Sequence, residues 1–297
     1  MAVLGLLHSL IRAEEKMILE AARDLDVPIV LKDIRKEIFD PETYQPDFDV
    51  ALERSVSTVK GIYVSAFLES MNIPVVNPLS VAEVCEDKFL TSLYLWKAGV
   101  PTMRFSLVFG LEEAMEVIEE WGGFPVVLKP PHGSWGRLLA KVNDREALEA
   151  IIEHKEVLGS PPHKAFYLQE YVRKPGRDIR VFVIGDEVVC AVYRESSHWI
   201  TNTARGGRTR NCPVYDQLRD ICVHAAKAIG GGLLAIDVFE TEKGLKINEI
   251  NHTMEFRNSE EPTGIRISHL IVEYCLQKAS QSHDKDRSIP FPEMSTD

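Results

Sequence analysis

The sequence predicts an α/β protein, with α+β character in its later part, built from several small lobes. Short apolar runs alternate with helix-like segments over roughly the first 80 residues, which is the pattern of a small open α/β lobe. Further along, pairs of apolar strands joined by glycine-bearing turns alternate with single helices, which indicates hairpins. At 297 residues the chain is long enough for two or three lobes, each with its own core.

The order of the predicted elements divides the chain. A long helical segment, 81–99, follows the first strand–helix series, and Gly99 is its natural C-terminal cap. A later hairpin is predicted to turn at Gly185 and Asp186. We therefore predict an N-terminal α/β lobe over 1–82, a central lobe over 83–165, a third lobe over 166–283 and a frayed polar tail over 284–297.

Composition excludes several classes of protein. A net charge of −11 argues against a general nucleic-acid binder, which needs a basic face. The five cysteines form no CxxC pair and no zinc spacing, which fits a reducing cytosol. No run of 18 apolar residues exists, and the apolar start has no preceding basic residue, so we interpret it as a strand rather than a signal peptide. We expect a cytoplasmic protein that binds neither nucleic acid nor membrane.

The segment 233–251 predicts a hairpin that carries a metal site. If its turn is centred at Lys243, Asp237 and Glu249 lie directly opposite each other, and Asn251 shares the face of Glu249. Facing like charges are destabilising, so amide substitution of either carboxylate is expected to relieve repulsion. Magnesium takes carboxylate and amide oxygens together with phosphate oxygens. The alternative is two solvated acids on an exposed face, against which the apolar flanks argue.

A glycine-bearing loop follows an apolar strand that ends at Lys129. Gly133, Ser134 and Gly136 lie in this loop, where glycine lets backbone N–H groups approach phosphates closely and the lysine adds a positive charge. It is not a Walker A loop, because no lysine of the chain is followed by Ser or Thr. Taken alone, such a loop is more often a simple hairpin turn.

Basic residues gather in two short segments of this acidic chain. Each segment could be a solvated basic loop. Near a candidate metal site, however, two such segments suggest binding of a polyanion. The basic residues are Arg173, Lys174, Arg177 and Arg180 around Asp178, and Arg205, Arg208 and Arg210 beside two glycines.

Taken in their order along the chain, the motifs resemble the ATP-grasp superfamily of carboxylate–amine ligases over about residues 1–280. "VVLKP", "QEYV…GRDIRVFVIGDEVV", "TN…GG" and "DV…INEIN" are similar to the RimK branch. "CEDKFLTSLYLWKAGVP" and "NHTMEFRNS" resemble more closely the LysX/ArgX ligases, which act in lysine and arginine biosynthesis on a carrier protein. The resemblance implies an ATP-grasp fold, with an N-terminal open α/β lobe followed by central and C-terminal ATP-grasp lobes.

The resemblance also implies roles for individual residues. Phosphate binding and closure over the triphosphate fall to Lys88, Lys129, His132, Gly133, Ser134, Trp135, Gly136 and Arg137, with Trp135 either a lid aromatic or a packing residue. Adenine contacts through backbone groups fall to Gln169, Glu170, Tyr171 and Val172, and the ribose contact falls to Asp178. Arg180 and Arg194 are the implied catalytic residues, Arg194 and Asn202 contact phosphate or acyl phosphate, and Asp237, Glu249 and Asn251 hold two magnesium ions.

The implied reaction uses ATP to convert a carboxylate to an acyl phosphate, which an amine then attacks. In the LysX/ArgX case the carboxylate belongs to the C-terminal glutamate of the acidic carrier LysW, and the amine is that of α-aminoadipate or glutamate. An acidic carrier needs a basic landing site, for which the two basic segments are the candidates, and a homo-oligomer (dimer or tetramer) is expected. The alternatives are a RimK-like glutamate ligase acting on a protein or peptide, and a non-catalytic nucleotide-binding regulatory module.

Asn258 and Ser259 follow the predicted metal strand and are expected to face the amine substrate. They resemble the Asn-Ser or Asn-Thr pair of the aminoadipate enzymes. In the glutamate enzymes the family pattern looks instead like Gly-Phe at these two positions. A phenyl ring would shorten the pocket, while serine leaves room for one more methylene. The alternative is that Asn258 caps the segment that follows and never meets substrate.

Overall fold

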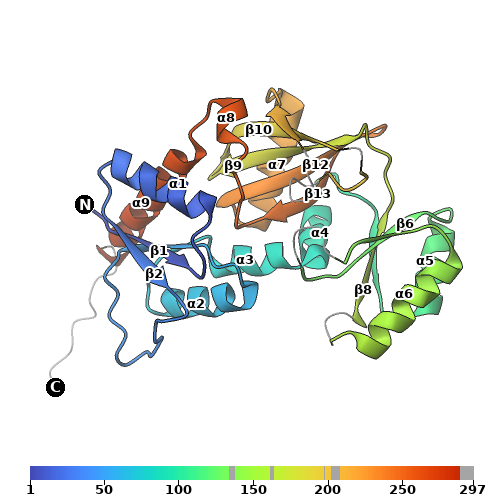
Figure 1. The fold of residues 1–297 in the computed structure, drawn as a ribbon, viewed down its shortest axis with the longest axis horizontal. Coiled ribbons are helices and arrows are strands. Elements are labelled where there is room, and N and C mark those ends of the chain that lie inside the picture. The colour runs from blue at the N-terminus through green and yellow to red at the C-terminus, as the bar shows by residue number, and fades with distance from the viewer. Residues whose placement is uncertain (134–137, 161–163, 197, 202–207, 288–297) are drawn as a thin grey trace, which may run out of the picture. The chain divides into compact units, whose positions relative to one another are not determined.

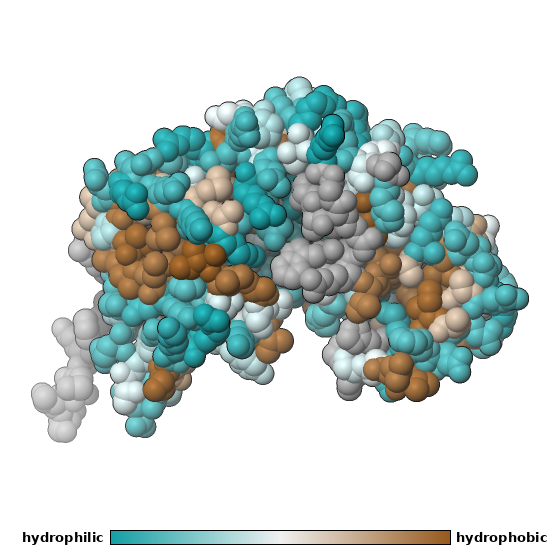
Figure 2. Space-filling view, viewed as in Figure 1, coloured by the Kyte–Doolittle hydropathy of each residue, from teal (hydrophilic) through white to brown (hydrophobic). Residues whose placement is uncertain are grey.

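The computed structural model describes residues 1–133, 138–160, 164–196, 198–201 and 208–287 (Figure 1). The chain divides into two compact units. One contains residues 1–79 together with the C-terminal residues from Arg266, and the other contains residues 80–265. None of the helices in the described part of the chain is long and apolar enough to cross a membrane. Figure 2 shows hydrophilic side chains over much of the face it presents, with hydrophobic patches between them.

The first unit is an open α/β lobe, as predicted. Its four parallel strands lie in the order β2-β1-β3-β4, and apolar residues such as Leu7, Ala51 and Val64 form its core. The strands are β1 (Leu4–His8), β2 (Ile29–Asp33), β3 (Val50–Glu53) and β4 (Val75–Val76), and the helices are α1 (Ala13–Asp24), α2 (Thr58–Ser70) and α9 (Ile267–Arg287).

The closing helix belongs to this first unit rather than to the predicted third lobe. Ile271, Val272 and Cys275 of α9 are buried, and the helix contacts α1, β1 and β3. The apolar periodicity of the segment predicted a helix correctly, but periodicity cannot say which apolar surface the helix covers.

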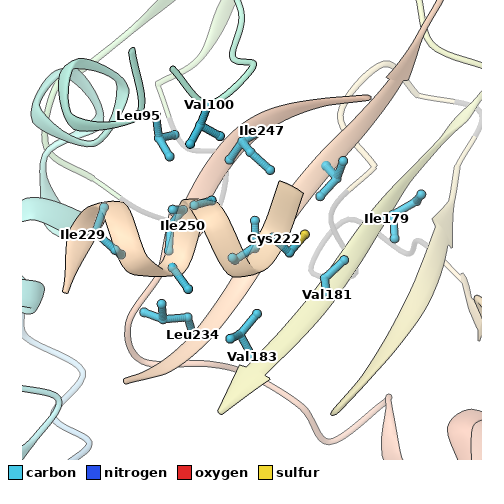
Figure 3. Packing of buried hydrophobic residues seen from close by; sticks show 14 of the residues in the cluster. Leu95, Val100, Ile179, Val181, Val183, Cys222, Ile229, Leu234, Ile247 and Ile250 are labelled. Carbon is cyan, nitrogen blue, oxygen red and sulfur yellow. The ribbon is translucent and has the colours of Figure 1, made fainter. Parts of the chain in front are cut away.

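The second unit contains two antiparallel sheets, ordered β5-β8-β6-β7 and β11-β10-β9-β12-β13. Helices α5 and α6 share a core with the first sheet, and α7 packs on the second, where Cys222 and Ile229 face Val181 and Ile250 (Figure 3). The first set of bounds is β5 (Phe105–Val108), α5 (Leu111–Glu120), β6 (Val126–Lys129), β7 (Ala140–Val142), α6 (Arg145–Leu158) and β8 (Phe166–Glu170). The second set is β9 (Arg177–Ile184), β10 (Glu187–Glu195), β11 (Arg208–Asn211), α7 (Asp216–Ile229), β12 (Leu233–Thr241), β13 (Gly244–Asn251) and α8 (Glu260–Thr263).

The second unit differs from the prediction in a lobe boundary and in elements that the sequence patterns did not indicate. The predicted boundary between 165 and 166 separates β8 from its sheet, because β8 pairs with β5 and β6. The sequence patterns predict no element at β5, α5 or β11. β11 escaped because its sequence, "RTRN", is polar and lies at the edge of the sheet.

The single helix predicted over 81–99 is two helices, α3 (Leu79–Glu86) and α4 (Lys88–Lys97). Asp87 interrupts them in an extended conformation, and its carboxylate accepts hydrogen bonds from the N–H groups of Phe89 and Leu90 at 2.8 and 2.9 Å. The first helix ends before Asp87, and the cap makes Lys88 the first residue of a new helix. Gly99 lies just beyond α4 with φ +72°, as the prediction of a glycine cap requires.

Both predicted hairpins are confirmed, the second with a change. Ile184 pairs with Glu187, so the first hairpin turns at Gly185 and Asp186. In the second, Thr241 pairs with Gly244. The turn is therefore centred between Glu242 and Lys243, half a residue before the predicted centre at Lys243. A bulge between Val238 and Asp237 then shifts the register by one residue.

The two aspartate N-caps of the second unit give a matched pair of stability tests. Asp144 caps α6 by accepting from the N–H of Ala147 at 2.8 Å, as Asp87 caps α4. We expect Asp87→Ala and Asp144→Ala each to lower the free energy of unfolding by about 1 kcal/mol, the usual contribution of an aspartate cap. Urea denaturation of each variant measures this. Unchanged stability in Asp87→Ala would mean that the break in the helix does not depend on its cap.

Candidate functional site

A cavity of about 400 Å³ lies in the second unit. Side chains from both of its sheets, and from the start of α4, line the cavity. Among the predicted site residues, it is lined by Lys88, Lys129, Gln169, Glu170, Tyr171, Val172, Asp178 and Glu249. The structure therefore brings predicted phosphate, adenine and ribose residues to one cavity with Glu249, whereas the other predicted metal residues, Asp237 and Asn251, do not line it.

One face of the five-stranded sheet carries the charged residues of the site. Ile179, Val181, Ile236 and Val238 point into the core with α7, so the alternate residues of β9 and β12 point to the opposite face. β10 and β13 continue this polar face. Its ionic and amide residues include Asp178, Arg180, Arg194, Asp237, Glu249 and Asn251.

Arg194 is the centre of this face, with only 2% of its surface exposed. Its Nε and one terminal nitrogen donate to the two oxygens of Asp178 at 2.7 and 2.8 Å, and the same terminal nitrogen lies 2.9 Å from Oδ2 of Asp237. Burial works against the charged guanidinium, but the two aspartates more than offset it, so the pKa of Arg194 lies above its ordinary value. Arg194 is thus a permanently charged group fixed on both sides.

Asp237 is held by two guanidiniums. Arg180 donates to both of its oxygens, at 2.9 and 3.1 Å, in addition to the contact from Arg194. Burial alone would raise the pKa of Asp237, but the two arginines hold it well below its ordinary value. The carboxylate is therefore ionised, as a metal ligand must be.

The predicted opposition of Asp237 and Glu249 is confirmed, and the bulge produces it. With the turn at 242–243, an undisturbed ladder would pair Asp237 with Asn248. The bulge makes Asn248 the extra residue and places Glu249 opposite Asp237, with Asn251 opposite Ala235. The Nδ2 of Asn251 lies 3.4 Å from the carbonyl oxygen of Ala235, so its amide oxygen is not used in that contact.

Two lysines approach this face from other elements. Lys88, at the start of α4, lies 3.4 Å from Oε1 of Glu249 and donates to the backbone carbonyl of Gly133. Lys129, at the end of β6, donates to Oδ1 of Asn248 at 3.1 Å. Burial lowers the pKa of Lys129 to about 8, with Lys88 adding to the shift and Glu249 opposing it. Both lysines line the cavity, so their ammonium groups can bind phosphate oxygens there.

The loop predicted to cover the triphosphate is described only at its start. His132 forms an isolated bridge with Asp87, and its Nε2 lies 3.3 Å from a carboxylate oxygen of that residue. Gly133 has φ +132°, a conformation that favours glycine. Ser134, Trp135, Gly136 and Arg137 lie outside the described residues, as does Asn202.

The predicted adenine-binding strand end is held by side-chain contacts. Glu170 accepts from Lys246 of β13 and, at 3.0 Å, from the backbone N–H of Arg104. Burial raises the pKa of Glu170, but these donors outweigh it and lower the pKa. Gln169 donates to the hydroxyl of Tyr167 at 3.2 Å. The side chains of Gln169 and Glu170 are thus occupied within the protein, which fits the expectation that backbone groups contact adenine.

An aromatic wall was missed by the sequence analysis. Trp199 and His198 line the cavity, with the ring of Trp199 6.5 Å from that of Tyr171 and 6.0 Å from that of His198. Lys141 lies 4.1 Å over the Tyr171 ring. An aromatic pair within a polar segment, "ESSHWIT", was the signal that could have indicated a ring-binding surface.

Most of the basic residues predicted to form a docking surface are paired with acids. Arg177 makes two hydrogen bonds with Glu240, at 2.7 and 2.9 Å, and Arg210 lies 2.9 Å from Glu195. Arg180 binds Asp237. Lys174 lies 3.7 Å from Asp178 and donates a hydrogen bond to the hydroxyl of Thr201. Arg173 lines the cavity, Arg208 is exposed, and Arg205 lies outside the described residues.

The two residues predicted to select the amine lie beside the polar face. Ser259, not Asn258, is the N-cap residue of the short helix α8, so the capping alternative for Asn258 does not hold. The backbone carbonyl of Asn258 accepts from the hydroxyl of Thr209, which is in register with Arg194 across β10 and β11. Asn258 is exposed and Ser259 is buried.

The donor set of the polar face fits magnesium. Two carboxylates, Asp237 and Glu249, face each other and share their side of the sheet with the amide of Asn251, which is the hard-oxygen set that magnesium prefers. Within the described residues no group of three His, Cys, Asp or Glu side chains could hold a metal. A metal here therefore needs the amide oxygen and oxygens from a phosphate.

Family comparison identifies the class that this fold and site define. Residues 85–275 match the RimK-like ATP-grasp domain, and residues 4–84 match the LysX preATP-grasp domain. The chain belongs to the RimK-like ATP-grasp family of ATP-dependent carboxylate–amine ligases. The predicted family, fold and enzyme class are confirmed.

Relatives named for two activities are equally similar to the chain. It is 33% identical to the α-aminoadipate–LysW ligase LysX of Sulfurisphaera tokodaii, over 94% of this chain and 98% of the relative. It is 34% identical to the glutamate–LysW ligase ArgX of the same organism, over 93% and 99%. A solved RimK domain ATP-grasp protein from Sphaerobacter thermophilus is 26% identical with a TM-score of 0.76, and covers 93% of this chain and 100% of that one.

Asp237→Asn tests the polar face. We expect turnover, measured as ADP release, to fall at least about 100-fold, because the ionised ligand is lost. The relief of repulsion expected from the sequence is reversed by the structure, because the partly buried Arg180 loses its ionised partner and the buried Arg194 keeps only one of its two. The free energy of unfolding should fall by about 3 kcal/mol. Asp216→Asn, at a nearly fully exposed position, is the control and should change neither quantity. Full activity in Asp237→Asn would contradict the metal assignment.

Proposed function

We propose that the chain joins the α-amino group of α-aminoadipate to the γ-carboxyl group of the C-terminal glutamate of an acidic LysW-type carrier, with glutamate as the competing amine. The relatives named LysX and ArgX support this proposal, since both align over nearly the whole chain. The reaction passes through an acyl phosphate formed from ATP. The location in the cytoplasm and the dimeric or tetrameric state stay predictions.

The observation that carries the proposal is the charge of the cavity and its rim. Six cationic groups meet four carboxylates there, within a chain of net charge −11. A local positive excess of this kind attracts a polyanion such as a triphosphate. The cations are Lys88, Lys129, Arg173, Lys174, Arg180 and Arg194, and the carboxylates are Glu170, Asp178, Asp237 and Glu249.

Each group has a distinct task in the proposed reaction. Lys88 and Lys129 bind phosphate oxygens, while the aromatic wall of Tyr171 and Trp199 receives the base. Asp237, Glu249 and Asn251 would hold two magnesium ions, which supply charge compensation for the transferring phosphoryl group. Arg194 stabilises the negative charge that develops there, together with Arg180. No protein nucleophile is needed, because the chemistry is positioning and electrostatics.

Asp178 has a second task besides the predicted ribose contact. Its carboxylate already binds Arg194, accepts from the hydroxyl of Thr201 and lies near Lys174. A ribose hydroxyl would share this acceptor with three donors of the protein. We therefore assign to Asp178 the task of fixing Arg194, with any ribose contact additional to it.

The docking surface for the carrier is smaller than the sequence suggests. Arg177, Arg180 and Arg210 are bound to acids of the same chain, so they offer a carrier less free charge than their number implies. Among the described residues of the two basic segments, Arg208 at the exposed edge strand β11 and the exposed Arg173 at the cavity remain as candidate contacts. β11 also touches Asn258, so a carrier tail bound along it would reach the amine-selecting residues.

ADP release with and without the carrier tests the proposed function. ADP should form only when ATP, carrier and an amino acid are all present, and fastest with α-aminoadipate. Release that needs no carrier, but occurs with a free glutamate-ended peptide, would instead support a RimK-like ligase. No release under any combination, with ATP still bound, would support a regulatory module.

The amine preference depends on Asn258 and Ser259. We expect the ratio of kcat/KM for α-aminoadipate over glutamate to exceed one in the wild type. In the Asn258→Gly, Ser259→Phe double variant the ratio should fall about tenfold or more, because one methylene is worth about 1–3 kcal/mol of discrimination. Thr263→Ser, which keeps the hydroxyl that bonds the carbonyl of Ser259, is a control. An unchanged ratio in the double variant would remove these residues from the pocket.

A further inference from the structure

The bulge in β13 places two neighbouring polar residues on the same face. In a regular strand successive side chains point to opposite faces. Here Leu245, Ile247 and Ile250 are buried in the core with α7, so the spacing of core residues changes from two to three between Ile247 and Ile250. Asn248 and Glu249 fill this interval, and both line the cavity.

Asn248 fixes the end of a long, buried lysine side chain. The Nζ of Lys129 donates to Oδ1 of Asn248 at 3.1 Å, and Lys129 is 4% exposed. A free lysine side chain has four rotatable bonds, and ordering it costs conformational entropy. A contact that orders the ammonium before a ligand arrives removes that cost from binding. An ammonium has three N–H donors, so one contact with Asn248 leaves two for a ligand.

The neutral amide holds the lysine without cancelling its charge. Lys88 lies 3.4 Å from the carboxylate of Glu249, so an anion that binds Lys88 competes with a negative group. Asn248 presents only a carbonyl dipole to Lys129, so this contact does not neutralise the ammonium that faces the phosphate oxygens. An aspartate at this position would orient the lysine equally well but would repel the phosphate.

We propose that Asn248 is a positioning residue that aims Lys129 at the phosphates of the bound nucleotide. The proposal rests on the function above only in taking the cavity as a nucleotide site. Asn248 is not among the residues that the sequence analysis assigned to the site, and its placement depends on the bulge. Its effect should be confined to ligands that carry phosphates.

Calorimetric binding of ADP and of adenosine separates positioning from a structural role. In Asn248→Ala the affinity for ADP should fall about tenfold, the effect of losing a hydrogen bond to a charged group. The affinity for adenosine should change less than about twofold. Asn211→Ala, which makes the same chemical change at an exposed position of β11, should leave both affinities unchanged. Equal losses for ADP and adenosine would overturn the proposal, since they would indicate a distorted cavity.

A double-mutant cycle with Lys129→Ala completes the test. If Asn248 acts through Lys129, Asn248→Ala should weaken ADP binding less than about twofold in the Lys129→Ala background. The same tenfold loss in both backgrounds would overturn the proposal. Asn248→Leu, similar in shape but without the amide, serves in the same cycle if the alanine variant does not fold. Failure of the wild type to bind ADP at all would instead refute the nucleotide site itself.

Discussion

The buried guanidinium of Arg194, held between Asp178 and Asp237, is the contact around which the site is arranged. A charge with 2% exposure is strongly unfavourable unless its partners are in place. Asp178 lies directly opposite Arg194 in the β9–β10 ladder, and Asp237 lies directly opposite Arg180 in the β9–β12 ladder. A slip of one residue in either ladder would turn these partners to the apolar face. The ion pairs therefore require both registers, which put Asp237 on the polar face, where the β12–β13 ladder places Glu249 opposite it.

The register of β12 and β13 shows how far sequence reasoning reaches. Counting from a turn at Lys243 predicted the opposition of Asp237 and Glu249 correctly. The turn is half a residue earlier, and the bulge compensates for it. Period-two counting assumes an unbroken ladder, so it could identify Glu249 and Asn251 but not Asn248, whose place on the polar face depends on the bulge. Likewise, the helical periodicity of 81–99 did not reveal the break between α3 and α4. An aspartate such as Asp87 is compatible both with the exposed surface of one long helix and with the N-cap of a new one.

Partners far apart in the sequence account for most of what remained unpredicted. The basic segment around Asp178 was interpreted as a free surface, yet Arg177 is bound to Glu240, which lies 63 residues further along the chain. Lys129 and Asn248 are 119 residues apart. Local composition records which charges are present but not which are neutralised by folding. For the same reason, the aromatic pair in "ESSHWIT" could not indicate that Trp199 lies beside Tyr171.

The distribution of neutralised and free charge explains how an acidic protein can bind anions. With net charge −11, the chain repels a nucleotide or an acidic carrier at long range, although salt screens this beyond about 8 Å. Within the cavity the cationic groups outnumber the carboxylates. Whether a cation is available to a ligand depends on whether its partner in the protein is an acid or a neutral amide. Arginines paired with aspartates form a fixed framework, whereas Lys129, held by an amide, keeps its charge for a ligand. Attraction is then confined to the few ångströms around the lysines, where only a group that enters the cavity can use it.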